Sequence, residues 1–250
     1  MLSIFVSSAV VLLALGIPIA IALGGSAMVY VLMQEDLSLT MLIQTSFAGM
    51  STFPLLAIPL FMLAGNLMNE GGLTRDLVRF ARLLLGHING GLGLATIVAS
   101  AIFAAISGAA VATAVAIGMV MIPAMKEAGY DEEVAAGVTA TASCMGPIIP
   151  PSIPFIMYGV IANVSIGALF LGGVVPGLLL ALFLMGYMYY VAKKRGYPKE
   201  QKATFSEVLL GAWKALPALL MPIIIMGGIL GGAFTPTEAA GVVVIYALLV

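Results

Sequence analysis

The sequence predicts an all-α integral membrane protein with transmembrane helices, a re-entrant helical hairpin and a helix broken by prolines. Of the 250 residues, 62% are hydrophobic and only 8% are charged, whereas soluble domains carry about 25% charged residues. Charged side chains are absent from five stretches, which are residues 1–34, 37–69, 83–125, 134–192 and 215–237. Each stretch exceeds the roughly 20 apolar residues that cross a hydrocarbon core. One of them also contains a cluster of prolines that no continuous helix accommodates.

Charge and the scarcity of ligand residues exclude several classes of function. The net charge of -1 and the pI near 5.8 leave no basic stripe for nucleic acid. Cys144 is the single cysteine and His87 the single histidine, so neither an internal disulfide nor a zinc or haem site is expected. Within the spans there are no paired carboxylates, no histidine cluster and no charged partner for a nucleophile, so we predict that the protein is not an enzyme. No cofactor is expected.

Residues 1–70 are expected to form scaffold transmembrane helices. The first span is predicted over residues 4–33, with a kink at Gly16 and Pro18 because proline removes a backbone donor. A polar turn at residues 34–36 separates it from a second span over residues 45–68.

Residues 71–91 are expected to form an amphipathic arm helix. Arg75, Arg79 and Arg82 recur at spacings of four and three, which places them on one face of a helix, opposite an apolar face. Such a helix lies along a membrane surface.

Residues 92–165 form the predicted transport-type element. The apolar run 92–125 has 34 residues, too long for one crossing and barely enough for two, so we expect a hairpin that turns near its middle. The second apolar run, 134–162, contains three prolines within residues 150–154, so we expect a broken helix there.

Residues 166–250 are expected to hold further transmembrane helices, over 168–192 and 216–233, and a run at 241–250 that begins another. The sequence is therefore expected to continue beyond its last residue. The basic residues at 75–82 and at 193–202 should both face the cytoplasm. An even number of crossings then separates them, which requires the run 92–125 to return to the side it left.

The first candidate binding site is the hairpin tip, residues 107–113. A chain that turns at membrane depth exposes backbone groups, which persist only where protein or an aqueous cavity covers them. Exposed carbonyls and the hydroxyls of Ser107 and Thr113 can ligate a hard cation such as sodium. Tight packing of small residues explains the same composition, and the residues alone leave both interpretations open.

The second candidate binding site is the break in the helix at residues 143–152. Its prolines lack N–H groups, so carbonyls one turn upstream lose their helical partners. Ser152 can cap the second half-helix, whose N-terminus favours an anion. The alternative is a kink whose freed groups are satisfied by neighbouring helices, but so many prolines favour a binding site. A hairpin tip and a broken helix at equal depth are typical of an ion-coupled transport site.

These motifs, in this order, resemble the DctM-like large membrane subunit of tripartite ATP-independent periplasmic (TRAP) transporters. The resemblance covers essentially the whole chain. It rests on Phe53-Pro54-Leu55-Leu56-Ala57-Ile58-Pro59-Leu60-Phe61, Ser107-Gly108, Gly146-Pro147-Ile148-Ile149-Pro150-Pro151-Ser152 and Phe234-Thr235-Pro236-Thr237-Glu238-Ala239-Ala240.

The resemblance implies a multi-pass protein of the bacterial inner membrane that imports small organic acids, such as C4-dicarboxylates or sialic acid, with sodium as the coupling ion. It also implies an elevator motion, a periplasmic substrate-binding protein and a small DctQ-like membrane subunit. Family members contain two inverted repeats, of which this sequence holds the first. Two alternatives remain, an anion/sodium symporter that needs no binding protein and a membrane scaffold subunit that transports nothing.

The resemblance also implies individual roles. The sodium ligands would be Ser107, Gly108, Ala110, Ser143, Gly146 and Ile149. The substrate contacts would be Thr113, Pro150, Pro151 and Ser152. A further serine is common in the family at the position that Ala109 occupies here.

Overall fold

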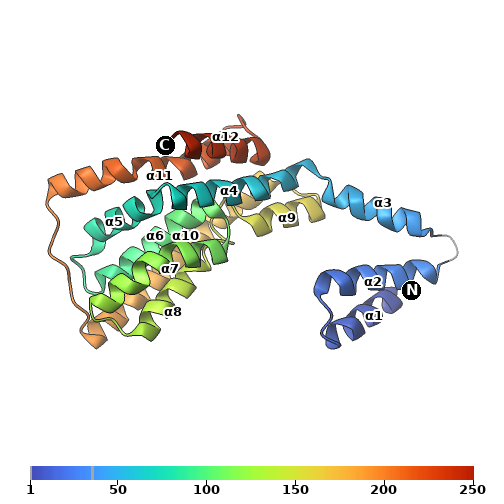
Figure 1. Cartoon of the computed structure of the whole chain (residues 1–250), viewed down its shortest axis with the longest axis horizontal. Coiled ribbons are helices and arrows are strands. Elements are labelled where there is room, and N and C mark those ends of the chain that lie inside the picture. The colour runs from blue at the N-terminus through green and yellow to red at the C-terminus, as the bar shows by residue number, and fades with distance from the viewer. Residues whose placement is uncertain (1, 35–36) are drawn as a thin grey trace. The chain divides into compact units, whose positions relative to one another are not determined.

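The computed structural model describes residues 2–34 and 37–250, and in this part of the chain it contains helices, turns and loops but no strand (Figure 1). Four of its helical segments are long and apolar enough to cross a membrane: Phe53–Glu70, Ala110–Glu127, Ile166–Arg195 and Phe205–Leu230. The predicted class, an all-α membrane protein, is confirmed. The chain divides into two compact units at Thr52 and Phe53.

The first unit contains α1 (Leu2–Ala14), α2 (Ile19–Leu32) and α3 (Leu39–Met50). The single kinked span predicted over residues 4–33 is wrong, because α1 and α2 are separate helices packed side by side (Figure 1). Gly16 adopts a φ of +76°, a left-handed conformation that reverses the chain where a kink was expected. Gly25 of α2 then comes to lie against Leu12 of α1. Residues 35 and 36 of the predicted polar turn lie outside the described residues.

The continuous second span predicted over residues 45–68 is also wrong. Its first part belongs to α3, and its second part forms a short 3-10 turn, η1 (Phe53–Leu56), followed by α4 (Ala57–Glu70) in the second unit. Pro54 explains the interruption, because a proline inside a helix removes a backbone donor and clashes with the preceding turn.

The second unit begins with η1 and α4 and continues with eight further helices. These are α5 (Leu73–Leu85), α6 (Gly91–Ser107), α7 (Ala110–Glu127), α8 (Glu132–Ser143), α9 (Ile153–Ala162), α10 (Ile166–Arg195), α11 (Phe205–Leu230) and α12 (Pro236–Leu249). α4 packs along α12, and α5 packs along α11 (Figure 1). The Thr237 hydroxyl of α12 donates a hydrogen bond to the carbonyl of Phe53 at 3.3 Å. Two of the motifs that carry the resemblance therefore lie side by side.

The predicted arm helix corresponds to α5, whose faces match the sequence pattern. Leu77 and Val78 are buried against the core, whereas Arg75 and Arg79 are exposed. The Arg82 guanidinium is 2.5 Å from a carboxylate oxygen of Glu200. The position of this helix along a membrane surface stays a prediction.

The hairpin and the break form the centre of the second unit. α6 and α7 are joined by only two residues, 108 and 109, and nine residues separate α8 from α9. The core around these helices contains large, fully buried side chains, among them Phe103, Ile106, Ile117, Met121 and, from α10, Phe170. The helical boundaries predicted for the transport-type element thus have counterparts in the structure.

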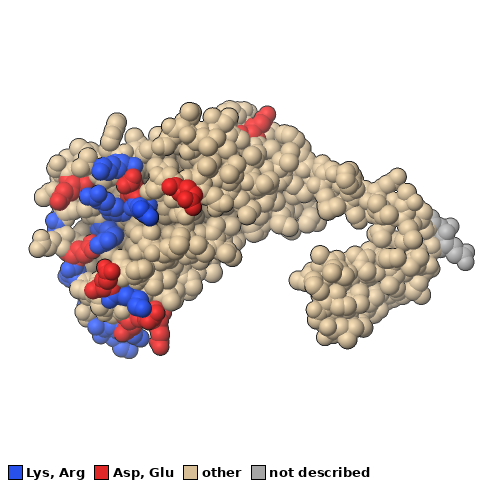
Figure 2. All heavy atoms as spheres, in the orientation of Figure 1, with Lys and Arg blue, Asp and Glu red and all other residues tan. Residues whose placement is uncertain are grey.

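The basic residues gather at one end of this unit, over α5, the α7–α8 turn and the junction of α10 with α11 (Figure 2). Ion pairs join these segments, including Arg82 with Glu200 and Arg195 with Asp131. The start of α6 and the end of α7 therefore lie at the same end, as the positive-inside argument requires. The depth of the hairpin in a bilayer stays a prediction.

Candidate ion and substrate site

The hairpin tip is a sharp turn built around a glycine. α6 ends at Ser107, Gly108 has a φ of +64°, and Ala109 is extended before α7 begins. L side chains rarely adopt this left-handed conformation. A Cβ atom on Gly108 would also lie 2.7 Å from the carbonyl oxygen of Pro151. Both the turn and the close approach therefore require glycine here.

Two buried hydroxyl groups meet at the tip. The oxygens of Ser107 and Thr113 are 3.2 Å apart, and the Thr113 hydroxyl also donates to the carbonyl of Ala109 at 2.9 Å. Because the Thr113 proton is used by Ala109, Ser107 is the donor in the hydroxyl pair. Both oxygens keep lone pairs that can face a cation.

The break runs from the end of α8 to the start of α9. The Ser143 hydroxyl donates to the carbonyl of Thr139 at 2.7 Å, within α8. Single turns follow, in which the N–H of Gly146 donates to the carbonyl of Ser143 at 3.0 Å and that of Ile149 to Met145 at 2.7 Å. The helical ladder then stops at the prolines, as their missing donors predict.

Ser152 closes the break and caps α9, as predicted. Its buried hydroxyl donates to the carbonyl of Pro147 at 2.6 Å and accepts from the N–H of Phe155 at 3.3 Å. The N–H of Ile153 donates to the carbonyl of Gly108, and that of Ile156 to the carbonyl of Ser152. Together with Pro154, which has no N–H, these bonds occupy the first donors of α9. The start of α9 therefore offers an anion a helix dipole rather than free backbone N–H groups.

The tip and the break are in direct backbone contact. The N–H of Ile153 donates to the carbonyl of Gly108 at 3.2 Å. A Cβ atom on Gly146 would lie 2.6 Å from the carbonyl carbon of Ala109 and 2.8 Å from the backbone nitrogen of Ala110. The structure thus brings together the two motifs that were singled out separately in the sequence.

Most of the predicted site residues lie at this contact. Those at or beside it are Ser107, Gly108, Ala110, Thr113, Gly146, Pro151 and Ser152. Pro150 precedes Pro151 in the break. Ser143 lies at the end of α8, one turn before Gly146. The side chain of Ile149 points the other way, because its Cγ1 would be 2.5 Å from a Cβ atom on Gly177 of α10.

Three glycines that support the site were missed. A Cβ atom on Gly65 of α4 would lie 3.3 Å from that of Ser107, and one on Gly173 of α10 would lie 2.4 Å from the carbonyl oxygen of Ile148. Gly173 and Gly177 are four residues apart, a spacing typical of close helix contacts in membranes that would have identified this pair. Gly65 has no comparable signal in the sequence.

Charged groups cluster away from the site. The Tyr197 hydroxyl donates to Asp131 at 2.6 Å, and together with Arg195 it holds the pKa of that carboxyl below its usual value. Tyr197 stacks on Tyr130 with ring centroids 4.2 Å apart, and burial raises the pKa of Tyr130 to about 12. Among the described residues no group of three or more His, Cys, Asp or Glu is placed to hold a metal. The tip and the break consequently offer only neutral oxygen atoms to an ion.

Comparison with known proteins identifies the family. Residues 6–250 match the family described as tripartite ATP-independent periplasmic transporter, DctM component. The chain belongs to this family. The resemblance predicted from the motifs is confirmed.

Several relatives show how much of such proteins the chain covers. It is 46% identical over 95% of its length to the isethionate TRAP transporter permease protein DctMQ of Oleidesulfovibrio alaskensis, and covers 38% of that protein. It is 43% identical over 95% of its length to the sialic acid TRAP transporter large permease protein SiaM of Vibrio cholerae, covering 56% of it. For the C4-dicarboxylate large permease protein DctM of the same organism, identity is 45%, and the match covers 94% of the chain and 52% of the relative. The chain therefore spans about half the length of the large permeases it matches.

Family membership agrees with two further predictions. The family is one of transporter components, as its description states, which agrees with the prediction that the chain is not an enzyme. Together with the four helical segments that can cross a bilayer, it also places the chain in the bacterial inner membrane as a multi-pass protein.

Proposed function

We propose that the chain forms the first repeat of a sodium-coupled symporter for small organic acids. The observation that carries this proposal is the backbone contact between the hairpin tip at Gly108 and the helix break at Gly146. A turn and a break of this kind within an apolar protein leave oxygen atoms outside a continuous helical hydrogen-bond ladder. An ion-coupled transport site uses such atoms.

Sodium as the coupling ion agrees with the groups that are present. Hard cations prefer oxygen ligands, and the hydroxyls of Ser107 and Thr113 lie beside the tip carbonyls. The ligand set implied by the family resemblance is proposed unchanged: Ser107, Gly108, Ala110, Ser143, Gly146 and Ile149. Because no carboxylate is present at the site, ion binding there makes the site more positive and favours the arrival of an anion.

A small organic acid is the proposed cargo. Relatives carry sialic acid, C4-dicarboxylate and isethionate in their names. The start of α9 presents the positive end of a helix dipole beside Ser152, Pro150 and Pro151, the proposed substrate contacts together with Thr113. With the first N–H donors of α9 already occupied, the acid's hydrogen-bond partners would come largely from residues outside this repeat.

The proposed partners are a periplasmic binding protein that delivers the acid and a small DctQ-like membrane subunit. The isethionate relative is named DctMQ, and the chain spans only 38% of it. In this arrangement α5, with Arg75, Arg79 and Arg82, is the arm that braces an element moving by an elevator mechanism. The extensive packing of α5 along α11 supports that role.

Uptake by proteoliposomes tests the proposal. The complete permease with its small subunit should accumulate labelled organic acid only when an inward sodium gradient and the binding protein are both present. Uptake without the binding protein would favour an independent anion/sodium symporter, and no uptake with any acid would favour a scaffold subunit. Gly108→Val should abolish uptake without preventing membrane insertion, whereas Gly172→Val, whose added atom meets nothing within 4 Å, should transport normally.

A further inference from the structure

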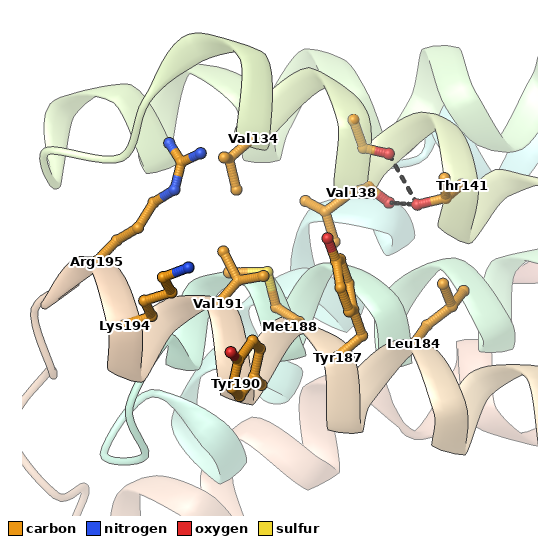
Figure 3. A pocket seen from close by; sticks show the side chains of 11 residues that line it. Val134, Val138, Thr141, Leu184, Tyr187, Met188, Tyr190, Val191, Lys194 and Arg195 are labelled. Atoms are coloured by element: carbon orange, nitrogen blue, oxygen red, sulfur yellow. Dashed lines mark hydrogen bonds between the residues drawn. The ribbon is translucent and has the colours of Figure 1, made fainter.

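A groove of about 650 Å³ lies between α8 and α10, apart from the tip and the break (Figure 3). Val134 and Val138 of α8 line one wall, and Leu184 and Val191 of α10 line the other. Tyr187 points from α10 toward α8, and Lys194 and Arg195 stand at one end of the groove (Figure 3).

We propose that this groove binds one anionic phospholipid, with an acyl chain between the two helices and the phosphate at Lys194. The length of the groove agrees with this occupant. Leu184 and Lys194 are ten residues apart on α10, which is about 15 Å at 1.5 Å per residue. That distance is half of the roughly 30 Å hydrocarbon core, so the groove matches one leaflet from its surface to the midplane.

The walls are suited to a hydrocarbon chain rather than to a polar solute. The hydroxyl of Thr141, a polar group in the wall, donates to the carbonyls of Gly137 and Val138 at 2.8 and 3.2 Å (Figure 3). This polar group is therefore satisfied within α8 and requires nothing from an occupant. Apart from the Tyr187 hydroxyl, the remaining inner wall offers mainly methyl and methylene groups, which an acyl chain covers without leaving a polar atom unpaired.

The charge at the open end selects an anionic headgroup. Arg195 is paired with Asp131, which offsets its charge, whereas no ion pair joins Lys194 to an acidic residue in the described part of the chain. Lys194 lies in the last turn of α10, beside Arg195, in one of the segments over which the basic residues gather. The positive-inside rule assigns this side to the cytoplasm. Basic pockets between membrane helices on this side bind anionic lipid headgroups.

One tyrosine, Tyr190, lies near the expected level of the membrane surface, one turn from Lys194. The side chains of Tyr187 and Tyr190 line the groove and are 69% and 62% exposed, one to two turns from Lys194. Tyrosines are enriched at membrane interfaces because their rings are apolar and their hydroxyls are polar. On α10, Lys194 and Tyr190 lie toward the headgroup end of the groove, and Met188 and Leu184 continue its wall toward the midplane.

Native mass spectrometry of the complete permease, titrated with phosphatidylglycerol or phosphatidylcholine, tests this site. Phosphatidylglycerol should bind more tightly, and Lys194→Gln should weaken its binding about fivefold, since one lysine near an anionic surface has about that effect. The control is Lys193→Gln, which removes the same charge from a neighbouring exposed residue outside the groove. Equal affinities for the two lipids, or equal effects of the two variants, would overturn the proposal.

A second pair of variants tests whether the acyl chain occupies the groove. An atom added to Gly137 of α8 meets nothing within 4 Å, so Gly137→Phe fills the groove without a backbone clash. Gly186→Phe adds the same side chain to an equally open position of α10 outside the groove. Phosphatidylglycerol binding should fall at least tenfold in the first variant only. Unchanged binding by Gly137→Phe would overturn the proposal, because the lipid would then bind elsewhere. The groove would then be covered by a further helix or by a second copy of the protein.

Discussion

Gly146→Ala isolates the contact between the tip and the break, because it adds a single methyl group at a position without left-handed strain. The new carbon would lie 2.6 Å from the carbonyl carbon of Ala109, whereas ordinary contacts begin near 3.4 Å. The two backbones must therefore separate by about 0.8 Å, the difference between these distances. No flexible side chain can give way instead, since all three nearest atoms belong to the backbone.

The energetic consequence follows from competing effects of known size. Overpacking of this kind costs about 1–3 kcal/mol, while replacing glycine with alanine restricts the unfolded chain and returns about 0.4–1 kcal/mol. The net loss is therefore between about zero and about 2.6 kcal/mol. The control Gly186→Ala, in an open position of α10, has only the favourable effect and should be stabilised by up to about 1 kcal/mol.

Thermal unfolding in detergent measures the difference. The gain from replacing glycine is common to both variants, so they differ by the overpacking cost of about 1–3 kcal/mol. At about 2–4 °C per kcal/mol for a chain of this size, Gly146→Ala should melt about 2–12 °C below Gly186→Ala. Sodium-driven uptake by the complete permease should fall at least tenfold in Gly146→Ala and stay normal in the control. If Gly146→Ala had the melting temperature of the control and transported normally, the close approach of the tip and the break would have no role in transport.

Of three further predictions, two concern the surroundings of the site and the third concerns the charged cluster away from it. Gly173→Ala should destabilise the protein by about 1–3 kcal/mol, because its Cβ would meet a backbone oxygen of the break at 2.4 Å, whereas Gly172→Ala should not; equal melting temperatures would refute this. Ser152→Ala should cost about 1–3 kcal/mol through the lost cap and the unpaired carbonyl, and an unchanged melting temperature would contradict the capping role. The pKa of Asp131 is lowered on folding, so its stabilising effect is complete above about pH 4 and is lost as the pH falls through the lower folded value. Asp131→Asn should therefore melt below the wild type at pH 6 and converge with it in acid; a constant gap down to pH 3 would rule out this ionisation.

The sequence was most informative where a residue type strongly restricts the backbone conformation. Prolines at 150, 151 and 154 remove donors whatever surrounds them, and the break lies where they predict it. The tip at Gly108 was found because an apolar run of this length cannot be one helix. The cap at Ser152 followed from the residue that precedes the second half-helix.

The errors arose where one pattern permits two structures. Gly16 followed by Pro18 interrupts a helix, but these residues are compatible both with a kink in one helix and with a turn that reverses the chain. Only the packing of α1 on α2 shows that the chain reverses. Pro54 likewise signals an interruption without revealing that a new unit begins there. The contacts of Gly65 could not be predicted, because its neighbour Ser107 is distant in sequence and hydrophobic periodicity does not specify partners.

The most direct test is a cryo-EM map of the complete permease in lipid nanodiscs, recorded in sodium and in a sodium-free buffer. The account predicts that α6 and α8 end inside the hydrocarbon layer and that density between Ser107, Gly108 and Gly146 appears only in sodium. Helices that continue unbroken through Ser107 and Pro150 to the far side of the bilayer would contradict it. A tip and a break that lie in water at the membrane surface would contradict it equally.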